Sequence, residues 1–195
     1  MAEAFERHID KDAVEKATRE LLIALGDNPE REGLVETPKR VAKFFDEAMQ
    51  GMLYTNHEIA QLYNKTFVSS SDGLVVEKDI PIFSWCEHHI ALMYDMNVSI
   101  AYLPHGRVVG LSKMARVAEM CGHRLQLQER LTQDIYDVMS EILGNQDVAV
   151  FVTGKHSCMT ARGIKKPDAF TTTNVLGGEF KTNPTLRAEV IAALK

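Results

Sequence analysis

The sequence predicts an α+β domain with an antiparallel sheet, preceded by an N-terminal helical arm. Two helical patterns come first, then short strand patterns with two helices among them, and then one more helix. Strands that follow one another without an alternating helix favour an antiparallel sheet over a parallel one. With 195 residues, 45% of them hydrophobic and 25% charged, the chain has the size and composition of one globular domain.

Helices are predicted where apolar residues recur at three- and four-residue spacing. The first begins at Asp10 or Asp12, because aspartate caps helix starts, and it ends at Gly26. The second begins at Thr37-Pro38, a cap residue followed by a proline at the first helical position. The remaining helical patterns cover residues 112–121, 127–143 and 184–194.

Strands are predicted by alternation of apolar with polar or small residues. Val98, Ile100 and Tyr102 alternate in this way, which is typical of a half-buried strand. The turn residues 104–106 then predict a hairpin with residues 107–111. The other strand candidates are Phe67 and residues 74–77, 80–83, 147–152 and 171–176.

Charge is distributed unevenly along the chain. Residues 1–60 hold 13 acidic and 8 basic side chains, whereas residues 61–195 hold 14 of each, so the net charge of −5 lies entirely in the first region. We therefore expect a helical arm over residues 1–60 and the α+β domain over residues 61–195. The net acidity argues against binding to nucleic acid or to an anionic membrane surface.

Three cysteines, an odd number, do not form a disulfide framework, and a chain of this length can bury its own core. The N-terminus shows no apolar stretch behind a basic patch, and the apolar stretches elsewhere are too short to span a bilayer. We expect a cytoplasmic protein with reduced thiols and no membrane partner. The question is then whether the cysteines fill the core or bind a metal.

Two short clusters combine cysteine with histidine. They are Cys86-Glu87-His88-His89 and His156-Ser157-Cys158. A turn can aim both Cys86 and His89 at one metal ion, and on an extended segment Cys158 points to the same side as His156. If the two segments are neighbours, Cys86, His89 and Cys158 could form a zinc site with an open fourth position, as in catalytic sites. His88 and His156 would then serve as proton donors and acceptors.

The alternative is that the cysteines are buried filler. Cys121 fits that description, because it lies on an apolar helical stripe. A Cys-x-x-His pair alone would also favour filler, but the neighbouring histidines and the second Cys–His pair favour a metal site. A structural zinc site should supply four protein ligands, and only three are well placed.

Two further groups suggest recognition of a nucleotide. Ser112, Lys113 and Arg116 begin a helix, where free backbone N–H groups favour phosphate, and Arg162 follows the second cluster. A buried Glu129 carboxylate could accept two parallel N–H bonds from a guanine-like edge. From these residues alone, solvated helix surfaces are favoured at both places.

Taken together, the motifs resemble the GTP cyclohydrolase I family of the zinc-dependent type. They occur in the family's order and spacing: Cys86-Glu87-His88-His89, Gly110-Leu111-Ser112-Lys113, Gln128-Glu129-Arg130-Leu131-Thr132, His156-Ser157-Cys158 and Ala161-Arg162-Gly163. The resemblance extends from about Thr37 to the C-terminal helix. Ser157 is smaller than the bulky residue expected there, and its side chain should point away from the site.

The resemblance implies a tunnelling fold, in which antiparallel sheets from several subunits close a barrel backed by helices. It also implies a homodecamer of two pentamers with active sites at subunit interfaces. By similarity, Zn²⁺ is bound by Cys86, His89 and Cys158, and the catalytic histidines are His88 and His156. Guanine is recognised by Glu129 with Gln128 beside it. The triphosphate is bound by Ser112, Lys113, Arg116, Arg162 and Arg40, some of them from a neighbouring subunit.

The reaction implied by the resemblance is hydrolytic opening of the guanine imidazole ring of GTP. Formate is released and 7,8-dihydroneopterin triphosphate is formed, the first step of pterin and folate biosynthesis. His156 would protonate N7, and His88 would carry protons in the later rearrangement. Two alternatives remain open: a related tunnelling-fold enzyme acting on another pterin or a deazapurine, and a non-enzymatic nucleotide sensor or structural zinc domain.

Overall fold

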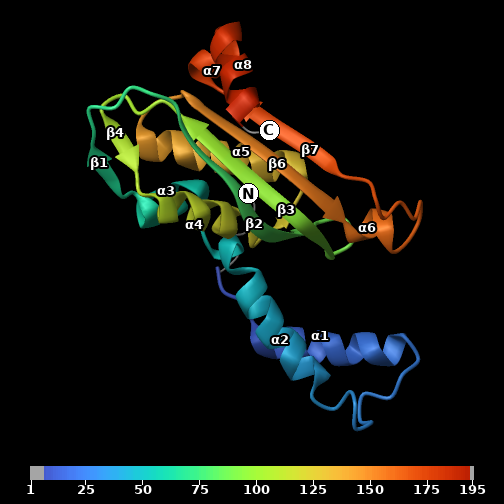
Figure 1. Ribbon diagram of the computed structural model, residues 1–195. Helices are drawn as coiled ribbons and strands as arrows, with labels where there is room; N and C mark the ends of the chain where they lie inside the picture. The colour runs from blue at the N-terminus through green and yellow to red at the C-terminus, as the bar shows by residue number, and fades with distance from the viewer. Residues whose placement is uncertain (1–6, 194–195) are drawn as a thin grey trace, which may run out of the picture. The chain divides into compact units, whose positions relative to one another are not determined.

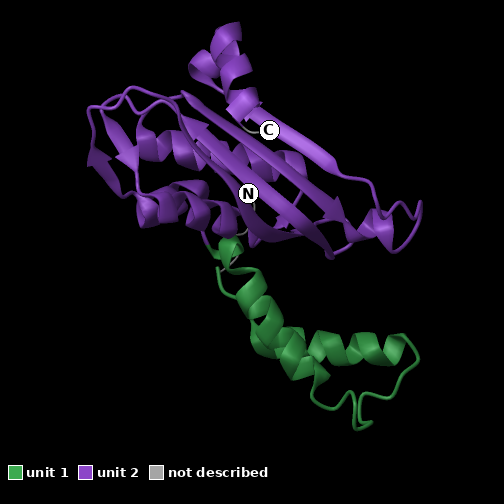
Figure 2. Ribbon diagram, viewed as in Figure 1, with its two compact units in different colours: residues 1–53 green, residues 54–195 purple. Residues whose placement is uncertain are grey.

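The computed structural model describes residues 7–193 and divides the chain into two units, residues 1–53 and 54–195 (Figure 2). The first unit contains two helices that pack together, α1 (Lys11–Ala24) and α2 (Thr37–Ala48), followed by the 3-10 helix η1 (Gln50–Leu53). Asp10 caps α1 as predicted, because its carboxylate accepts a hydrogen bond from the Ala13 N–H at 2.9 Å. The division of the chain into an arm and a catalytic domain stays a prediction.

The start of α2 differs from the prediction by one residue. Glu36 is the N-cap and Thr37 is already helical, so the expected cap at Thr37 is wrong. Proline lacks the N–H that the first helical turn leaves unbonded, so Pro38 is tolerated at either of the first two positions. The proline therefore located the helix start only to within one residue.

The second unit is built on a five-stranded sheet with the order β5-β2-β3-β6-β7 (Figure 1). The pair β5–β2 is parallel and the other pairs are antiparallel. The strands are β2 (Val75–Cys86), β3 (Ala91–Tyr102), β5 (Leu125–Gln126), β6 (Val148–His156) and β7 (Thr171–Leu176). This arrangement confirms the predicted α+β class with its antiparallel sheet.

Strands β2 and β3 form a long hairpin. Its register runs from Val75 opposite Tyr102 at the open end to Cys86 opposite Ala91 at the turn. The two candidates at residues 74–77 and 80–83 are parts of this one strand β2. Between them the register shifts, and Asp79 there has a φ of 59°. Aspartate tolerates this left-handed conformation, which lets the strand continue past the irregularity.

The hairpin predicted between residues 98–102 and 107–111 is wrong. Strand β4 (Arg107–Val109) instead pairs with β1 (Thr66–Val68) in a separate two-stranded sheet. The Arg107 guanidinium donates to the Thr66 hydroxyl at 2.9 and 2.7 Å. The Tyr102 hydroxyl accepts from the Val109 N–H at 3.0 Å, so β4 lies beside the Tyr102 side chain rather than along the β3 backbone.

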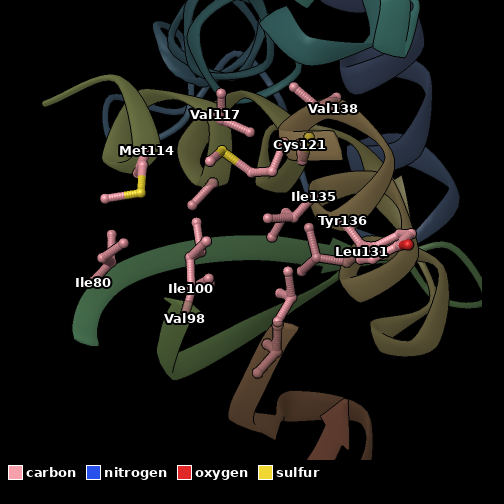
Figure 3. Close-up of a cluster of buried hydrophobic side chains, with 14 of the residues drawn as sticks. Ile80, Val98, Ile100, Met114, Val117, Cys121, Leu131, Ile135, Tyr136 and Val138 are labelled. Carbon is pink, nitrogen blue, oxygen red and sulfur yellow. The ribbon is translucent and has the colours of Figure 1, made fainter. Parts of the chain in front are cut away.

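Two helices, α4 (Leu111–Gly122) and α5 (Gln128–Leu143), pack against the sheet, and α3 (Asn56–Tyr63) packs on both of them. Figure 3 shows side chains from α4 and α5 meeting those of β2 and β3, including Met114, Leu131 and Val98. Helix α3 was not predicted, although the sequence contains its capping box, Thr55 and Glu58. Thr55 accepts from the Glu58 N–H, and the Glu58 carboxylate accepts from the Thr55 N–H.

A smaller core uses the opposite face of the sheet. Ala101 of β3 and Ala149 of β6 pack there with Phe180 and Val190. These last two residues belong to α7 (Gly178–Thr182), which was not predicted, and α8 (Pro184–Ala193). The predicted end of the last helix, Leu194, lies outside the described residues. None of the helices described is both long and apolar enough to cross a bilayer.

The main core gives a direct stability prediction. Ile135 of α5 is fully buried against the sheet, so Ile135→Ala should lower the free energy of unfolding by about 2–5 kcal/mol. Urea unfolding followed by circular dichroism measures this loss. The matched helical control is Ile191→Ala, whose side chain is exposed and whose effect should stay within about 0.5 kcal/mol. Equal losses in the two variants would contradict the assigned core.

Candidate metal centre and active site

The turn of the β2–β3 hairpin carries the first Cys–His cluster. Cys86 is the last residue of β2 and is buried, and the His89 N–H donates to the Cys86 carbonyl at 3.3 Å. This tight turn places a sulfur and an imidazole on one short segment. Ile90 closes the turn with a φ of 52°. The turn therefore brings the Cys86 and His89 side chains together, as their two-residue separation predicted.

The second cluster lies where β6 ends. His156 is the last strand residue and faces Met93 of β3, while Cys158 lies on the short helix α6 (Ser157–Thr160). The expectation that His156 and Cys158 share one extended segment is wrong, because the chain turns helical at Ser157. The Ser157 hydroxyl donates to the Leu92 carbonyl at 2.5 Å, which fastens the start of α6 to β3.

The structure brings Cys86, His89 and Cys158 together. One possible ligand atom from each lies within 4.8 Å of the other two. Two sulfurs and one imidazole nitrogen are donors that zinc prefers, and three protein ligands leave a fourth position open. Burial, and then the neighbouring Cys86 sulfur, raise the pKa of the Cys158 thiol. A bound cation would oppose this effect, since metals stabilise thiolates. The donor set therefore fits Zn²⁺.

The remaining histidine of the first cluster lies beside this group, and that of the second comes two residues before Cys158. The Nδ1 atom of His88 is 3.8 Å from the Cys86 sulfur. His156 is half-buried, and its Nε2 atom is 2.8 Å from the Gln128 amide oxygen. Burial lowers the pKa of His156, and the Glu129 carboxylate raises it, so Glu129 is close enough to interact with the ring. His88 thus lies beside the Cys86 sulfur, and Glu129, which was expected to be buried, is exposed and lies near the His156 ring.

Arg162 also reaches this centre. It follows α6 and donates from Nη1 to His89 Nε2 at 2.8 Å. The guanidinium is exposed, so an anion could approach it from solvent. Gln128, by contrast, is buried, and its amide nitrogen donates to the Val152 and Thr171 carbonyls at 3.1 and 3.0 Å. Direct contact of Gln128 with guanine stays a prediction.

Ser112, Lys113 and Arg116 are not part of the same group within one chain. They lie on the first half of α4, whose N-cap is Gly110. The other end of α4 is near the hairpin turn, because a β-carbon on Gly122 would lie 2.7 Å from the Phe83 carbonyl oxygen. A helix of 12 residues is about 18 Å long, so Ser112 and Lys113 begin α4 far from Cys86.

Arg40 lies on α2 in the first unit and is exposed. Its role toward a triphosphate stays a prediction.

Sequence reasoning missed an ion pair that supports the first cluster. The Arg130 guanidinium contacts the Glu87 carboxylate and also donates to the Gln126 side-chain oxygen at 2.9 Å. The Glu87 N–H donates to the Gln126 carbonyl at 3.1 Å. Opposite charges 43 positions apart give no sequence signal, because their meeting depends on the parallel pairing of β5 with β2.

Comparison with known proteins gives concordant matches over nearly the whole chain. The family model of GTP cyclohydrolase I matches residues 14–195. GTP cyclohydrolase 1 of Clostridium acetobutylicum is 53% identical over 192 residues, which cover 96% of this chain and 98% of that protein. The Clostridium beijerinckii protein of the same name is 48% identical over 195 residues, covering 97% and 99%. One from Clostridium botulinum (strain Loch Maree / Type A3) is 54% identical over 182 residues, covering 90% and 93%.

Proposed function

Because the chain belongs to the GTP cyclohydrolase I family of enzymes, we propose that it opens the imidazole ring of GTP by hydrolysis, releasing formate and forming 7,8-dihydroneopterin triphosphate. The observation that carries this proposal is the convergence of Cys86, His89 and Cys158. The residues meet from two strand ends that are far apart in sequence.

In this proposal Cys86, His89 and Cys158 hold a zinc ion. When bound, zinc supplies a water nucleophile at neutral pH. The Glu129 carboxylate accepts the two N–H groups on the guanine edge, which holds the base with its five-membered ring toward the metal. His156 transfers a proton to N7 as the ring opens, and His88 carries protons in the later rearrangement of the ribose.

The triphosphate carries several negative charges, and the Arg162 guanidinium donates to His89, one of the ligands of the proposed metal centre. Ser112 and Lys113 begin α4, far from that centre within the same chain. If they bind the triphosphate, a neighbouring subunit must supply them. We therefore propose that the active site is shared between subunits, in the homodecamer of two pentamers expected for the family.

The proposal places the enzyme in the cytoplasm, where the Cys86 and Cys158 thiols stay reduced and available to zinc. Its product would enter pterin and folate synthesis. Chemistry at the guanine ring also distinguishes the proposed enzyme from a nucleotide sensor, which would bind GTP and release it unchanged.

Incubation of the purified protein with GTP tests the proposal. Formate should accumulate together with a pterin that becomes fluorescent after oxidation, and metal analysis should find zinc. Zinc-loaded protein that yields neither formate nor pterin would refute the assignment. A chelator-treated sample serves as the control, and adding zinc back to it should restore formate release.

A further inference from the structure

The side-chain amide of Gln128 has hydrogen-bond partners at both its nitrogen and its oxygen. Gln128 is the first residue of α5, and its side chain is fully buried between the helix and the sheet. Its nitrogen donates to the Val152 carbonyl at 3.1 Å and to the Thr171 carbonyl at 3.0 Å. Its oxygen lies 2.8 Å from His156 Nε2. Both amide protons and the amide oxygen are therefore engaged inside the protein.

The orientation of this amide follows from its two carbonyl partners. A carbonyl oxygen only accepts hydrogen bonds, so the amide group that faces two of them must be the nitrogen. Turning the amide over would place its oxygen against the carbonyl oxygens of Val152 and Thr171, and no oxygen of these three can donate to another. The Gln128 oxygen consequently faces His156.

The hydroxyl groups next to Gln128 agree with this orientation. Thr132 Oγ1 lies 2.7 Å from the Gln128 backbone carbonyl and must donate to it, which uses its one proton. Thr173 Oγ1 is 2.6 Å from Thr132 Oγ1, so Thr173 must be the donor of that pair. A Thr173 lone pair then faces the Gln128 nitrogen at 3.4 Å, where it can share one of the two amide protons.

The direction of the last hydrogen bond determines the state of the histidine. An amide oxygen only accepts, so His156 Nε2 must carry a proton. A neutral imidazole has one N–H, and Nδ1 is left with a lone pair. Within residues 7–193, no hydrogen bond is made to Nδ1 of His156. The two ring nitrogens therefore differ: one is committed to Gln128, and the other can take up a proton.

We propose that Gln128 is a positioning residue, which holds His156 in the Nε2–H tautomer so that Nδ1 exchanges protons with the substrate. This inference rests on the proposed function. As water adds across the C8–N7 double bond of guanine, its hydroxyl joins C8 and its proton passes to His156 Nδ1. Nδ1 then gives that proton to N7, and Nε2 keeps its own proton throughout. His156 thus begins the reaction as a base and returns to its starting tautomer.

Magic-angle-spinning nitrogen-15 NMR of the full-length, zinc-loaded protein tests the tautomer directly. Histidine is labelled, and the spectrum is recorded at a pH at which the His156 ring is neutral. We expect a protonated-type resonance for His156 Nε2 and an unprotonated-type resonance for Nδ1. The signals are assigned by their loss in His156→Ala. The opposite tautomer would overturn the proposal, and this measurement requires no change at Gln128.

Gln128→Met tests whether Gln128 sets the tautomer of His156. Methionine keeps the length of the side chain but offers no amide, so the His156 resonances should shift toward a mixture of tautomers. We expect kcat to fall about 10- to 100-fold with a nearly unchanged KM for GTP. The matched control is Gln133→Met on the same helix, where the exposed amide donates to the Asp137 carboxylate. This control should leave the spectrum and kcat unchanged.

Other outcomes have defined meanings. If Gln128→Met leaves the His156 resonances unchanged, Gln128 does not set the tautomer and the proposal is wrong. If in addition KM rises while kcat stays the same, the proposal is wrong and Gln128 contacts guanine instead. Absence of formate in the unaltered protein would refute the proposed function without touching the tautomer assignment, because the NMR measurement needs no substrate.

Discussion

Cys158→Ser is expected to remove bound zinc and the release of formate together. Serine keeps the size of the side chain but replaces a thiolate ligand with a hydroxyl that zinc binds poorly at neutral pH. Metal catalysis contributes several kcal/mol of transition-state stabilisation. A loss of about 4 kcal/mol corresponds to about a thousandfold in rate. Metal analysis of the purified variant and a formate assay measure the two effects.

Cys121→Ser is the matched control, because it makes the same substitution outside the metal centre. Cys121 is fully buried in the main core, and burial raises the pKa of its thiol to about 12. The serine hydroxyl should cost about 1–3 kcal/mol of folding stability while zinc remains bound. Retention of zinc in Cys158→Ser would contradict the proposed ligand set, whatever the activity.

The second large effect is expected from His156→Ala. Removing a general acid–base group should lower kcat by about 10²- to 10⁴-fold. Zinc should remain bound, since the proposed ligands are Cys86, His89 and Cys158. Measuring both turnover and metal content therefore distinguishes a lost proton carrier from a lost metal ligand.

His57→Ala provides the histidine control. His57 is exposed on α3 and contacts the Glu141 carboxylate at 2.7 Å, on a surface away from the Cys–His clusters. We expect the turnover of His57→Ala to equal that of the unaltered protein. Loss of zinc from His156→Ala would show that His156 is a ligand and would require a different metal set.

The sequence located the halves of the candidate site because each depends on local spacing. Cys86 and His89 meet through a turn of their own, and the Cys-x-x-His pattern encodes that turn. Cys158 does lie with Cys86 and His89, but it is not on the extended segment that was expected to bring it there. The predicted extended segment is the short helix α6, held at β3 by Ser157, and no local pattern indicates that contact.

Contacts set by long-range pairing could not be predicted. Gln128 was assigned to guanine recognition from its place beside Glu129, but its partners Val152 and Thr171 lie 24 and 43 positions away. Its contact with guanine stays a prediction, whereas the predicted hairpin is wrong. Alternation identified the strand at residues 107–109, but it carries no information on which strand it pairs with, and its partner is β1. This error arises in the tertiary pairing rather than in the elements themselves.

The central position of β3 also constrains the order of folding. Its pairing with β2 closes a short loop, whereas its pairing with β6 must bring together segments separated by both α4 and α5. Loop-closure entropy favours the hairpin first, and hairpins form in about 1–10 μs. Cys86 and His89 would thus be placed early, and Cys158 only when β6 docks. We therefore expect metal loading to follow assembly of the sheet rather than to nucleate it.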